Sequence, residues 1–283
     1  MPISRRWILV LLGPPLIFLI AFFVVPFFVV VISSLHNQQG DWTLANYAKA
    51  ILDFYYWDTL ILTFTLSLYV TVICLVIGYP LAYYMIYSLK SPLVRRFFYI
   101  VVVTPLFTSN IVRSFGWMVL LGRRGMVNDA LVGIGIIERP IALMFNETSI
   151  IIGLSYIMTP FMVLTVSGVL QNIDRSLEEA AQDLGAGRFV TFLKVTLPLS
   201  MPGVVAGSLI VFTLSVSAYV TPSIMSGGKK IVMSMLIFQQ YGSVFDFNFG
   251  ATLAVALLVS TMLLVGVYLL LMERTPRTKV ARA

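Results

Sequence analysis

RSLEEAAQDLGAGRFVTFLKVTLPLSMPG, residues 175–203, is a charged segment that ends in prolines and lies between two long hydrophobic runs. Across the whole chain of 283 residues, 59% are hydrophobic and 11% are charged, and the mean hydropathy is +0.95. Soluble domains carry about 25% charged residues. The composition therefore indicates a membrane protein, and we expect the quoted segment to lie in water beside the membrane.

The first part of the quoted segment predicts a short amphipathic helix. Its apolar stripe has the spacing i, i+3, i+4 and i+7 and consists of Leu177, Ala180, Ala181 and Leu184. Ser176 and Glu179 fit a capping box, in which each side chain accepts a hydrogen bond from an amide of the first turn. Gly185 and Gly187 predict the end of the helix. Its acidic residues make a poor face for anionic lipid, so the pattern favours docking to a protein over a passive loop.

A second amphipathic piece covers residues 188–195. Pro198 is expected to end it, because proline disfavours a helical conformation at the preceding Leu197.

Six hydrophobic runs are long enough to span a membrane, since a helix needs about 20 apolar residues to cross the hydrocarbon core. They are Ile8–Ile32, Thr59–Tyr87, Phe97–Leu121, Thr148–Leu170, Gly203–Thr221 and Phe249–Met272. Membrane barrel strands would show segments of about 10 residues that alternate in hydropathy, which these runs do not. Among charged residues, Arg113 alone interrupts a run.

The net charge of +7 is distributed in a way that predicts membrane orientation rather than nucleic-acid binding. If the N-terminus is cytoplasmic, twelve basic residues fall inside: Arg5, Arg6, Lys90, Arg95, Arg96, Arg175, Arg188, Lys194, Arg274, Arg277, Lys279 and Arg282. Six fall outside: Lys49, Arg123, Arg124, Arg139, Lys229 and Lys230. Both termini are therefore expected in the cytoplasm.

Several classes of site are excluded by residue counts. With Cys74 and His36 as the single cysteine and histidine, the chain can form neither an internal disulfide nor a multi-histidine metal site. No stretch fits G-x-x-x-x-G-K-[ST], the phosphate-binding loop of many ATPases, and 227–230 (GGKK) lacks the earlier glycine and the final hydroxyl. If the protein uses ATP, we expect another subunit to bind it.

The quoted segment resembles the EAA signature of ABC importer permeases. The pattern of that family is EAA, three residues, glycine, nine residues, then Ile-x-Leu-Pro, and the chain matches it from Glu179 to Pro198, with Val195 in place of isoleucine. Three more stretches look like the B-type permease of spermidine/putrescine importers: TLANY at 43–47, VRSFGWMVLLGRRGMVND at 112–129, and PLSMPGVVAGSLIVFTLSVSAYVTPSIMSGGKK at 198–230. Together they extend over nearly the whole chain.

The resemblance implies an all-α membrane fold of type I, with six transmembrane helices in a single domain, 1–283, and a cytoplasmic coupling loop at 171–202. It also implies a bacterial inner-membrane protein that pairs with a second, homologous permease, two ATPase subunits that bind ATP and Mg²⁺, and a periplasmic solute-binding protein. No cofactor, catalytic residue or metal site is expected in this chain. The residues expected to couple it to the ATPase are Glu179, Ala180, Ala181, Asp183, Gly185 and Ala186.

Candidates for the transport pathway are Arg113, Trp117, Tyr156, Tyr219 and Thr221. Aromatic faces bind amines by cation–π contact. A charge deep in a membrane is costly unless it has a partner or faces a cavity, so Arg113 is expected to bond to backbone carbonyls or to the partner permease. For an anionic cargo, a place in the pathway would be favoured instead. Asp58, Glu147 and Asp246 are expected near the outer ends of the spans.

Two alternative functions remain open. The same importer class could carry another small organic solute, such as an aminophosphonate. An intramembrane enzyme is a remote alternative, because Ser155 in 153–155 (GLS) has no evident base other than His36 at the outer end of the first run.

Overall fold

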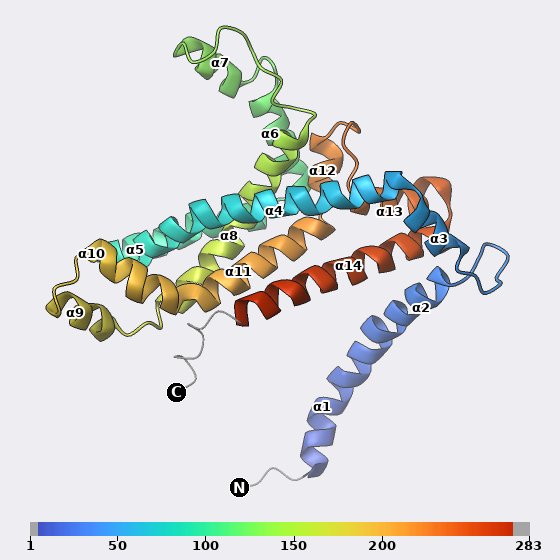
Figure 1. Ribbon diagram of the computed structural model, residues 1–283, viewed down its shortest axis with the longest axis horizontal. Helices are drawn as coiled ribbons and strands as arrows, with labels where there is room; N and C mark the ends of the chain where they lie inside the picture. The colour runs from blue at the N-terminus through green and yellow to red at the C-terminus, as the bar shows by residue number, and fades with distance from the viewer. Residues whose placement is uncertain (1–4, 274–283) are drawn as a thin grey trace. The chain divides into compact units, whose positions relative to one another are not determined.

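A computed structural model describes residues 5–273, and the side chains of residues 11–272 (Figure 1). The described part of the chain is almost entirely helical, which confirms the predicted all-α fold class. The basic residues counted at the two ends, namely Arg5, Arg6, Arg274, Arg277, Lys279 and Arg282, lie outside the side chains that the structure describes.

Five helices in the described residues are long and apolar enough to cross a membrane. They are Leu11–Ser34, Phe54–Ser88, Glu147–Leu170, Arg188–Ser217 and Phe247–Met272. A sixth span results if Pro92–Phe107 and Asn110–Gly133, which are bent by 100° relative to each other, are taken as one.

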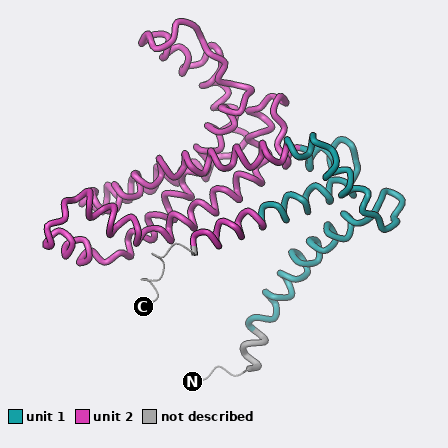
Figure 2. The backbone as a smooth tube through the Cα atoms, in the orientation of Figure 1, with its two compact units in different colours: residues 1–58, 236–262 teal, residues 59–235, 263–283 magenta. Residues whose placement is uncertain are grey.

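The helices group into two compact units, shown in Figure 2. The first unit comprises residues 1–58 and 236–262. It contains α1 (Arg5–Leu19), a π-helical turn (Ile20–Val24), α2 (Val25–Ser34), α3 (Ala45–Leu52), a π-helical turn (Gln240–Val244) and the first part of α14 (Phe247–Glu273). A side-chain hydrogen bond joins α14 to α2 in this unit: Asn248 Nδ2 donates to the carbonyl of Ser33 over 3.0 Å.

The second unit comprises residues 59–235 and 263–283. It contains most of α4 (Phe54–Tyr83), η2 (Tyr84–Ser88), α5 (Pro92–Val103), η3 (Thr104–Phe107), α6 (Asn110–Leu121), α7 (Met126–Gly133), α8 (Glu147–Leu170), α9 (Arg175–Asp183), α10 (Arg188–Thr191), η4 (Phe192–Thr196), α11 (Leu197–Ser217), α12 (Val220–Met225) and the start of α13 (Met233–Gln239). All the predicted coupling and pathway residues belong to this unit.

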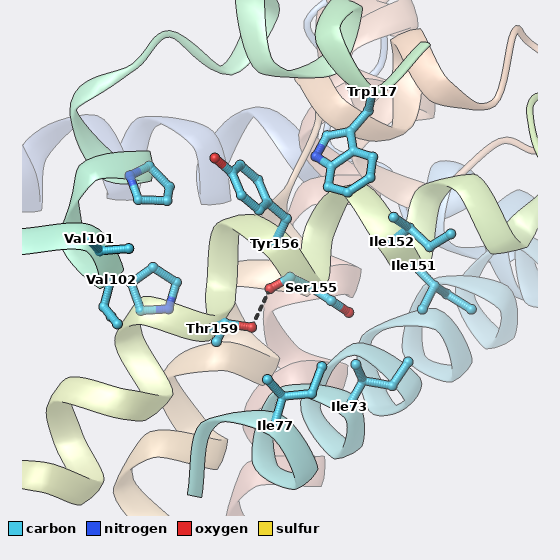
Figure 3. Close-up of a pocket in the computed structure, with 12 residues that line it drawn as sticks. Ile73, Ile77, Val101, Val102, Trp117, Ile151, Ile152, Ser155, Tyr156 and Thr159 are labelled. Carbon is cyan, nitrogen blue, oxygen red and sulfur yellow. Dashed lines mark hydrogen bonds between the residues drawn. The ribbon is translucent and has the colours of Figure 1, made fainter. Parts of the chain in front are cut away.

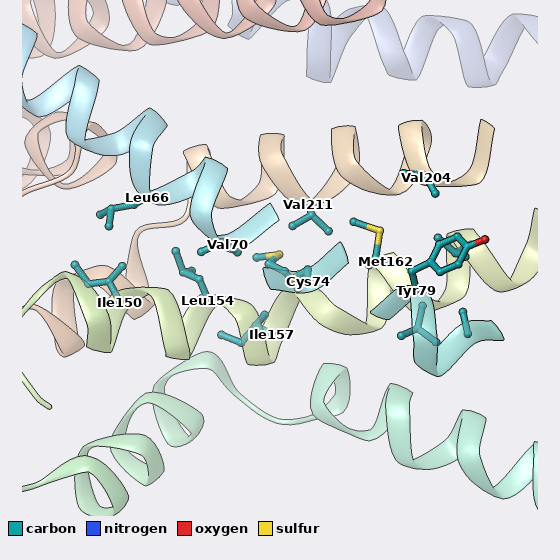
Figure 4. Close-up of a cluster of buried hydrophobic side chains, with 14 of the residues drawn as sticks. Leu66, Val70, Cys74, Tyr79, Ile150, Leu154, Ile157, Met162, Val204 and Val211 are labelled. Atoms are coloured by element: carbon teal, nitrogen blue, oxygen red, sulfur yellow. The ribbon is translucent and has the colours of Figure 1, made fainter. Parts of the chain in front are cut away.

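Close packing of α4, α8 and α11 makes the core of the second unit (Figure 4). Glycines set the short helix separation: a Cβ atom on Gly78 would lie 2.9 Å from Met162 Cγ, and one on Gly203 would lie 2.9 Å from Val169 Cγ2. The fully buried side chains of this core include Leu66, Val70, Met162, Val163, Val166 and Val211. Since lipid tails are as apolar as leucine, it is this tight packing, rather than hydrophobicity, that holds the three helices together.

The third hydrophobic run, predicted as one helix over Phe97–Leu121, is broken. α5 ends in the 3₁₀ turn η3, Thr108 is extended, and α6 begins after a 100° bend. Ser109 starts the new helix, because its hydroxyl accepts a hydrogen bond from the amide of Ile111 over 3.3 Å. Proline at position 105 and the capping serine are local helix breakers that outweigh the hydrophobic pattern.

The predicted helix end before Pro198 is also wrong. Helix continues from Arg188 to Ser217, because the π-helical η4 leads directly into α11. Proline is tolerated near the start of α11, where the amide of Leu197 bonds back to the carbonyl of Phe192. This fifth span also ends earlier than predicted, since Ala218 is extended and Val220–Met225 forms the separate α12.

Candidate functional site

Helix α9 begins with a different cap from the one its sequence predicts. Asp174, not Ser176, is the N-cap, and its carboxylate accepts a hydrogen bond from the amide of Ser176 over 2.9 Å. That hydrogen bond lowers the pKa of Asp174 from its usual value. The predicted capping box between Ser176 and Glu179 is therefore wrong, because the carboxylate of Asp174, two residues before Ser176, already caps the first turn.

Helix α9 ends at the predicted glycine. Gly185 has φ +87°, a left-handed conformation, and its amide donates to the carbonyl of Gln182 over 2.8 Å. The amide of Ala186 donates to the carbonyl of Ala181 over 3.0 Å. These two hydrogen bonds define a Schellman motif, in which glycine avoids the steric cost that a Cβ atom would have. No atom outside the turn lies within 4 Å of a Cβ built on Gly185, so the constraint is conformational.

The apolar stripe of α9 points away from its own chain. Leu177 is 49% exposed and Leu184 is 90% exposed. Phe189 on the following α10 is 72% exposed as well. Among the predicted coupling residues, Glu179, Ala180, Asp183 and Gly185 are exposed, and Ala181 and Ala186 are half-buried. The apolar side of α9 thus faces away from the rest of the chain, whereas a surface helix usually turns its apolar side to the core. We call this reversed amphipathicity.

The polar side of α9 makes the contacts to the bundle. Arg175 Nη2 donates to the carbonyl of Ile86 over 3.2 Å, and its guanidinium lies 5.5 Å from the ring centroid of Tyr87. Thr196 Oγ1 donates to the carboxylate of Glu178. The sequence interpretation missed Arg175 and Glu178 as functional candidates, although the i, i+3 spacing does place them on one face of a helix.

A pocket of about 410 Å³ lies among α4, α5, α6 and α8 (Figure 3). Trp117 and Tyr156 line it together, with their rings edge to face and their centroids 5.5 Å apart. The other lining residues are almost all apolar: Ile73, Ile77, Val101, Val102, Pro105, Ile151, Ile152, Ser155, Thr159 and Pro160. Ser155 Oγ is buried and has no hydrogen-bond partner among the described residues.

The remaining pathway candidates do not line this pocket. Arg113 Nη1 donates to the carbonyl of Pro105 over 2.5 Å, and Nη2 donates to Asn110 Oδ1, so the guanidinium bridges the break between η3 and α6. Thr221 on α12 is buried, and its hydroxyl lies 3.4 Å from that of Ser114. Tyr219 is half-buried just before α12. Arg113 thus bonds to a backbone carbonyl, whereas its Nε is buried and has no hydrogen-bond partner among the described residues.

Two of the three carboxylates predicted near the outer ends of the spans have partners within the chain. Glu147 forms an ion pair with Lys230, with 2.5 Å between Oε1 and Nζ. Asp246 accepts a hydrogen bond from the amide of Phe249 over 3.0 Å, in the first turn of α14. In the described residues no group of three or more His, Cys, Asp or Glu side chains could hold a metal ion.

The class of the protein follows from its relatives, which are membrane transport components. Residues 74–273 match the family described as "Binding-protein-dependent transport system inner membrane component", and the chain belongs to this family. It is therefore a permease component of an ABC importer and not an enzyme.

Among its relatives are two proteins named "Spermidine/putrescine transport system permease protein PotB". The one from Escherichia coli (strain K12) is 34% identical over 227 residues, which cover 80% of this chain and 81% of the relative. The one from Haemophilus influenzae is 33% identical over 259 residues, which cover 88% of each. A solved bacterial ABC transporter involved in the import of the acidic polysaccharide alginate has the same fold, with a TM-score of 0.74 at 18% identity, over 96% of this chain and 97% of that one.

Proposed function

We propose that the chain forms half of the translocation pathway of an ATP-driven importer for polyamines such as spermidine and putrescine, and that α9 is its joint with an ATPase subunit. The observation that carries the joint is the reversed amphipathicity of α9. Leu184 is 90% exposed at the tip of a helix that follows a membrane span. An exposed apolar patch rimmed by polar residues is typical of a protein-binding surface.

The coupling residues divide the joint into a contact surface and a turn. Ala180 and Leu184 form a small exposed apolar surface. Glu179 and Asp183, which are also exposed, supply negative charge at its edge. The left-handed Gly185 turns the chain back, so that α9 projects as a compact knob that fits a cleft. The ATPase subunits bind ATP and Mg²⁺, and closure of the ATPase pair would pull on this knob.

The assembly that we propose contains this permease, a second homologous permease, two ATPase subunits and a periplasmic solute-binding protein. The binding protein delivers the solute to the outward-open cavity, and movement of the coupling helices switches the spans to the other state. The chain lies in the inner membrane of a bacterium with both termini cytoplasmic. Arg175, Arg188 and Lys194 then lie on the cytoplasmic side, in accord with the excess of basic residues expected there.

A polyamine cargo is supported by the two relatives and by the chemistry of the pocket. The faces of Trp117 and Tyr156 attract a protonated amine, and each such contact contributes about 0.5–2 kcal/mol. Arg113 is the feature that opposes this cargo, because its guanidinium binds the carbonyl of Pro105, a residue that lines the pocket, and carries a positive charge there. Methylene groups of a polyamine fit the apolar remainder of the pocket.

The experiment that tests the cargo is ATPase activity of the reconstituted complex with its binding protein. Spermidine and putrescine are titrated against anionic and zwitterionic amines, including an aminophosphonate. Stimulation by polyamines alone supports the proposal. Stimulation by an aminophosphonate, but not by a polyamine, would overturn the cargo and leave the ATPase joint untouched.

A further inference from the structure

The polar face of α9 is tied to two different membrane spans through the side chains of Arg175 and Glu178. Arg175 contacts η2, which continues α4 to the end of the second span at Ser88. Glu178 contacts Thr196 in η4, which leads into α11 and the fifth span. The two side chains lie three residues apart, on the same face of α9.

The tie to α4 uses the end of a helix. The carbonyl of Ile86 lies in the last turn of that span, where carbonyl groups lack partners within the helix and attract cations. The guanidinium of Arg175 supplies both a donor and a positive charge there, and it also covers the ring of Tyr87.

The tie to α11 uses a buried hydroxyl. Thr196 is 1% exposed and Glu178 is half-buried, so their hydrogen bond is shielded from water. Hydrogen bonds with one ionised partner are shorter and roughly twice as strong as neutral ones. The contact therefore resists displacement of α9 relative to the start of α11.

Aromatic rings extend both ties into the bundle. Tyr87 stacks on Tyr83 with centroids 4.7 Å apart, and Tyr83 meets Phe192 of η4 edge to face at 5.3 Å. Phe192 also contacts Tyr79, whose hydroxyl lies 2.8 Å from the hydroxyl of Ser200 on α11. The cytoplasmic ends of α4 and α11 thus form one connected layer under α9.

We propose that Arg175 and Glu178 are positioning residues that pass the displacement of α9 to α4 and α11, respectively. This inference rests on the proposed ATPase joint but concerns the opposite face of the helix. The outer face binds the ATPase, whereas the inner face converts its movement into movement of the spans. Loss of an inner contact should leave the ATPase bound and reduce the work done per ATP.

The test measures solute imported per ATP hydrolysed, and ATPase association, in the reconstituted complex. Glu178→Ala and Thr196→Val each remove the tie to α11, and we expect the ratio to fall about tenfold, as for loss of one charged hydrogen bond. The double variant should be no worse than either single one, because both remove the same contact. Arg175→Ala should lower the ratio through the tie to α4.

Matched variants separate this role from general damage. Thr191→Val removes another buried hydroxyl, which bonds to the carbonyl of Gly187 one turn earlier, and should keep the wild-type ratio. Thr196→Ser retains the hydroxyl donor, so it should also show the wild-type ratio. Glu178→Gln keeps the size and an acceptor oxygen, so it assembles if Glu178→Ala does not, and its ratio should fall about threefold.

The outcomes distinguish this inference from the proposed joint. Leu184→Glu on the outer face should abolish ATPase association, and continued association would contradict the joint itself. An unchanged ratio in Glu178→Ala, Glu178→Gln and Thr196→Val, or a loss of ATPase association in these variants, would overturn the positioning role.

Discussion

Helices α8 and α9 follow one another in the chain but are held in opposite ways. α8 buries residues along its whole length against α4 and α11, whereas α9 has no buried residue. Shape complementarity fixes α8, and a few directional contacts from Arg175 and Glu178 fix α9. The difference teaches that the core resists displacement everywhere, while the position of α9 depends on single side chains. Variants in the two regions should therefore fail in different assays.

The largest effect is expected from overpacking the α8–α11 contact. In Gly203→Leu the new Cβ atom would lie 2.9 Å from Val169 Cγ2 and 3.3 Å from the backbone Cα of Val166. We expect the free energy of unfolding to fall by about 2–3 kcal/mol, and the yield of assembled complex to fall with it. Thermal unfolding in detergent measures the change.

The control for this variant is Gly168→Ala on α8, where no atom lies within 4 Å of the new Cβ. It should leave the unfolding temperature unchanged or slightly raised. Equal losses in the two variants would show that the close approach at Gly203 does not limit stability.

The second largest effect is expected at the turn that ends α9, where a substitution should reduce transport without loss of assembly. Gly185→Val forces a β-branched residue into the left-handed region, which costs about 1–2 kcal/mol and distorts the Schellman turn. We expect normal assembly of the two permeases but at least about tenfold less transport. Uptake by proteoliposomes measures this, and Gly187→Ala, at a position with φ −65°, is the matched control. Wild-type uptake by Gly185→Val would contradict the role of the turn.

A smaller effect is expected in the pocket, whose lining includes no residue of α9. Trp117→Ala removes one aromatic face, and the spermidine concentration for half-maximal transport should rise about 3- to 10-fold, with ATPase association unchanged. Trp117→Phe should retain most of the affinity. A rise of the same size for an uncharged solute would point to lost packing rather than to amine recognition.

The smallest effect is expected at the cap of α9. The pKa of Asp174 is lowered in the folded chain. Its contribution to the stability of α9 is therefore fully present above the pKa of the unfolded chain, and it is lost as pH falls through the pKa of the folded chain. Asp174→Asn keeps a cap that does not titrate in this range. ATPase association at pH 7 should stay within about twofold of wild type. At acid pH, ATPase association should weaken in the wild type but not in Asp174→Asn. An identical pH dependence of association in both proteins would rule out this cap as the cause.

Local signals in the sequence were enough to predict that α9 forms, that it ends at Gly185 and which segments are apolar enough to span a membrane, but not the cap of α9 or the bounds of the third and fifth spans. The break at Thr108 was missed because a hydrophobic run hides a helix end that proline and a capping serine impose. The contacts of α9 could not be predicted, since Arg175 meets a carbonyl 89 positions earlier and Glu178 meets a hydroxyl 18 positions later. Spacing within a helix shows which residues share a face, but not what that face meets.

The wide turn η4 lets the chain between Gly185 and α11 hold one residue more than an unbroken α-helix would. A π-helical turn holds one more residue than an α-helical turn, so deleting one residue from 192–196 would convert it into ordinary α-helix. Because either turn completes about one revolution, α9 would keep its direction relative to the buried face of α11. A deletion inside α11 itself would instead rotate the two by about 100°, the angle by which each residue of an α-helix advances the side-chain direction. Single deletions should therefore be tolerated better within 192–196 than within 197–217.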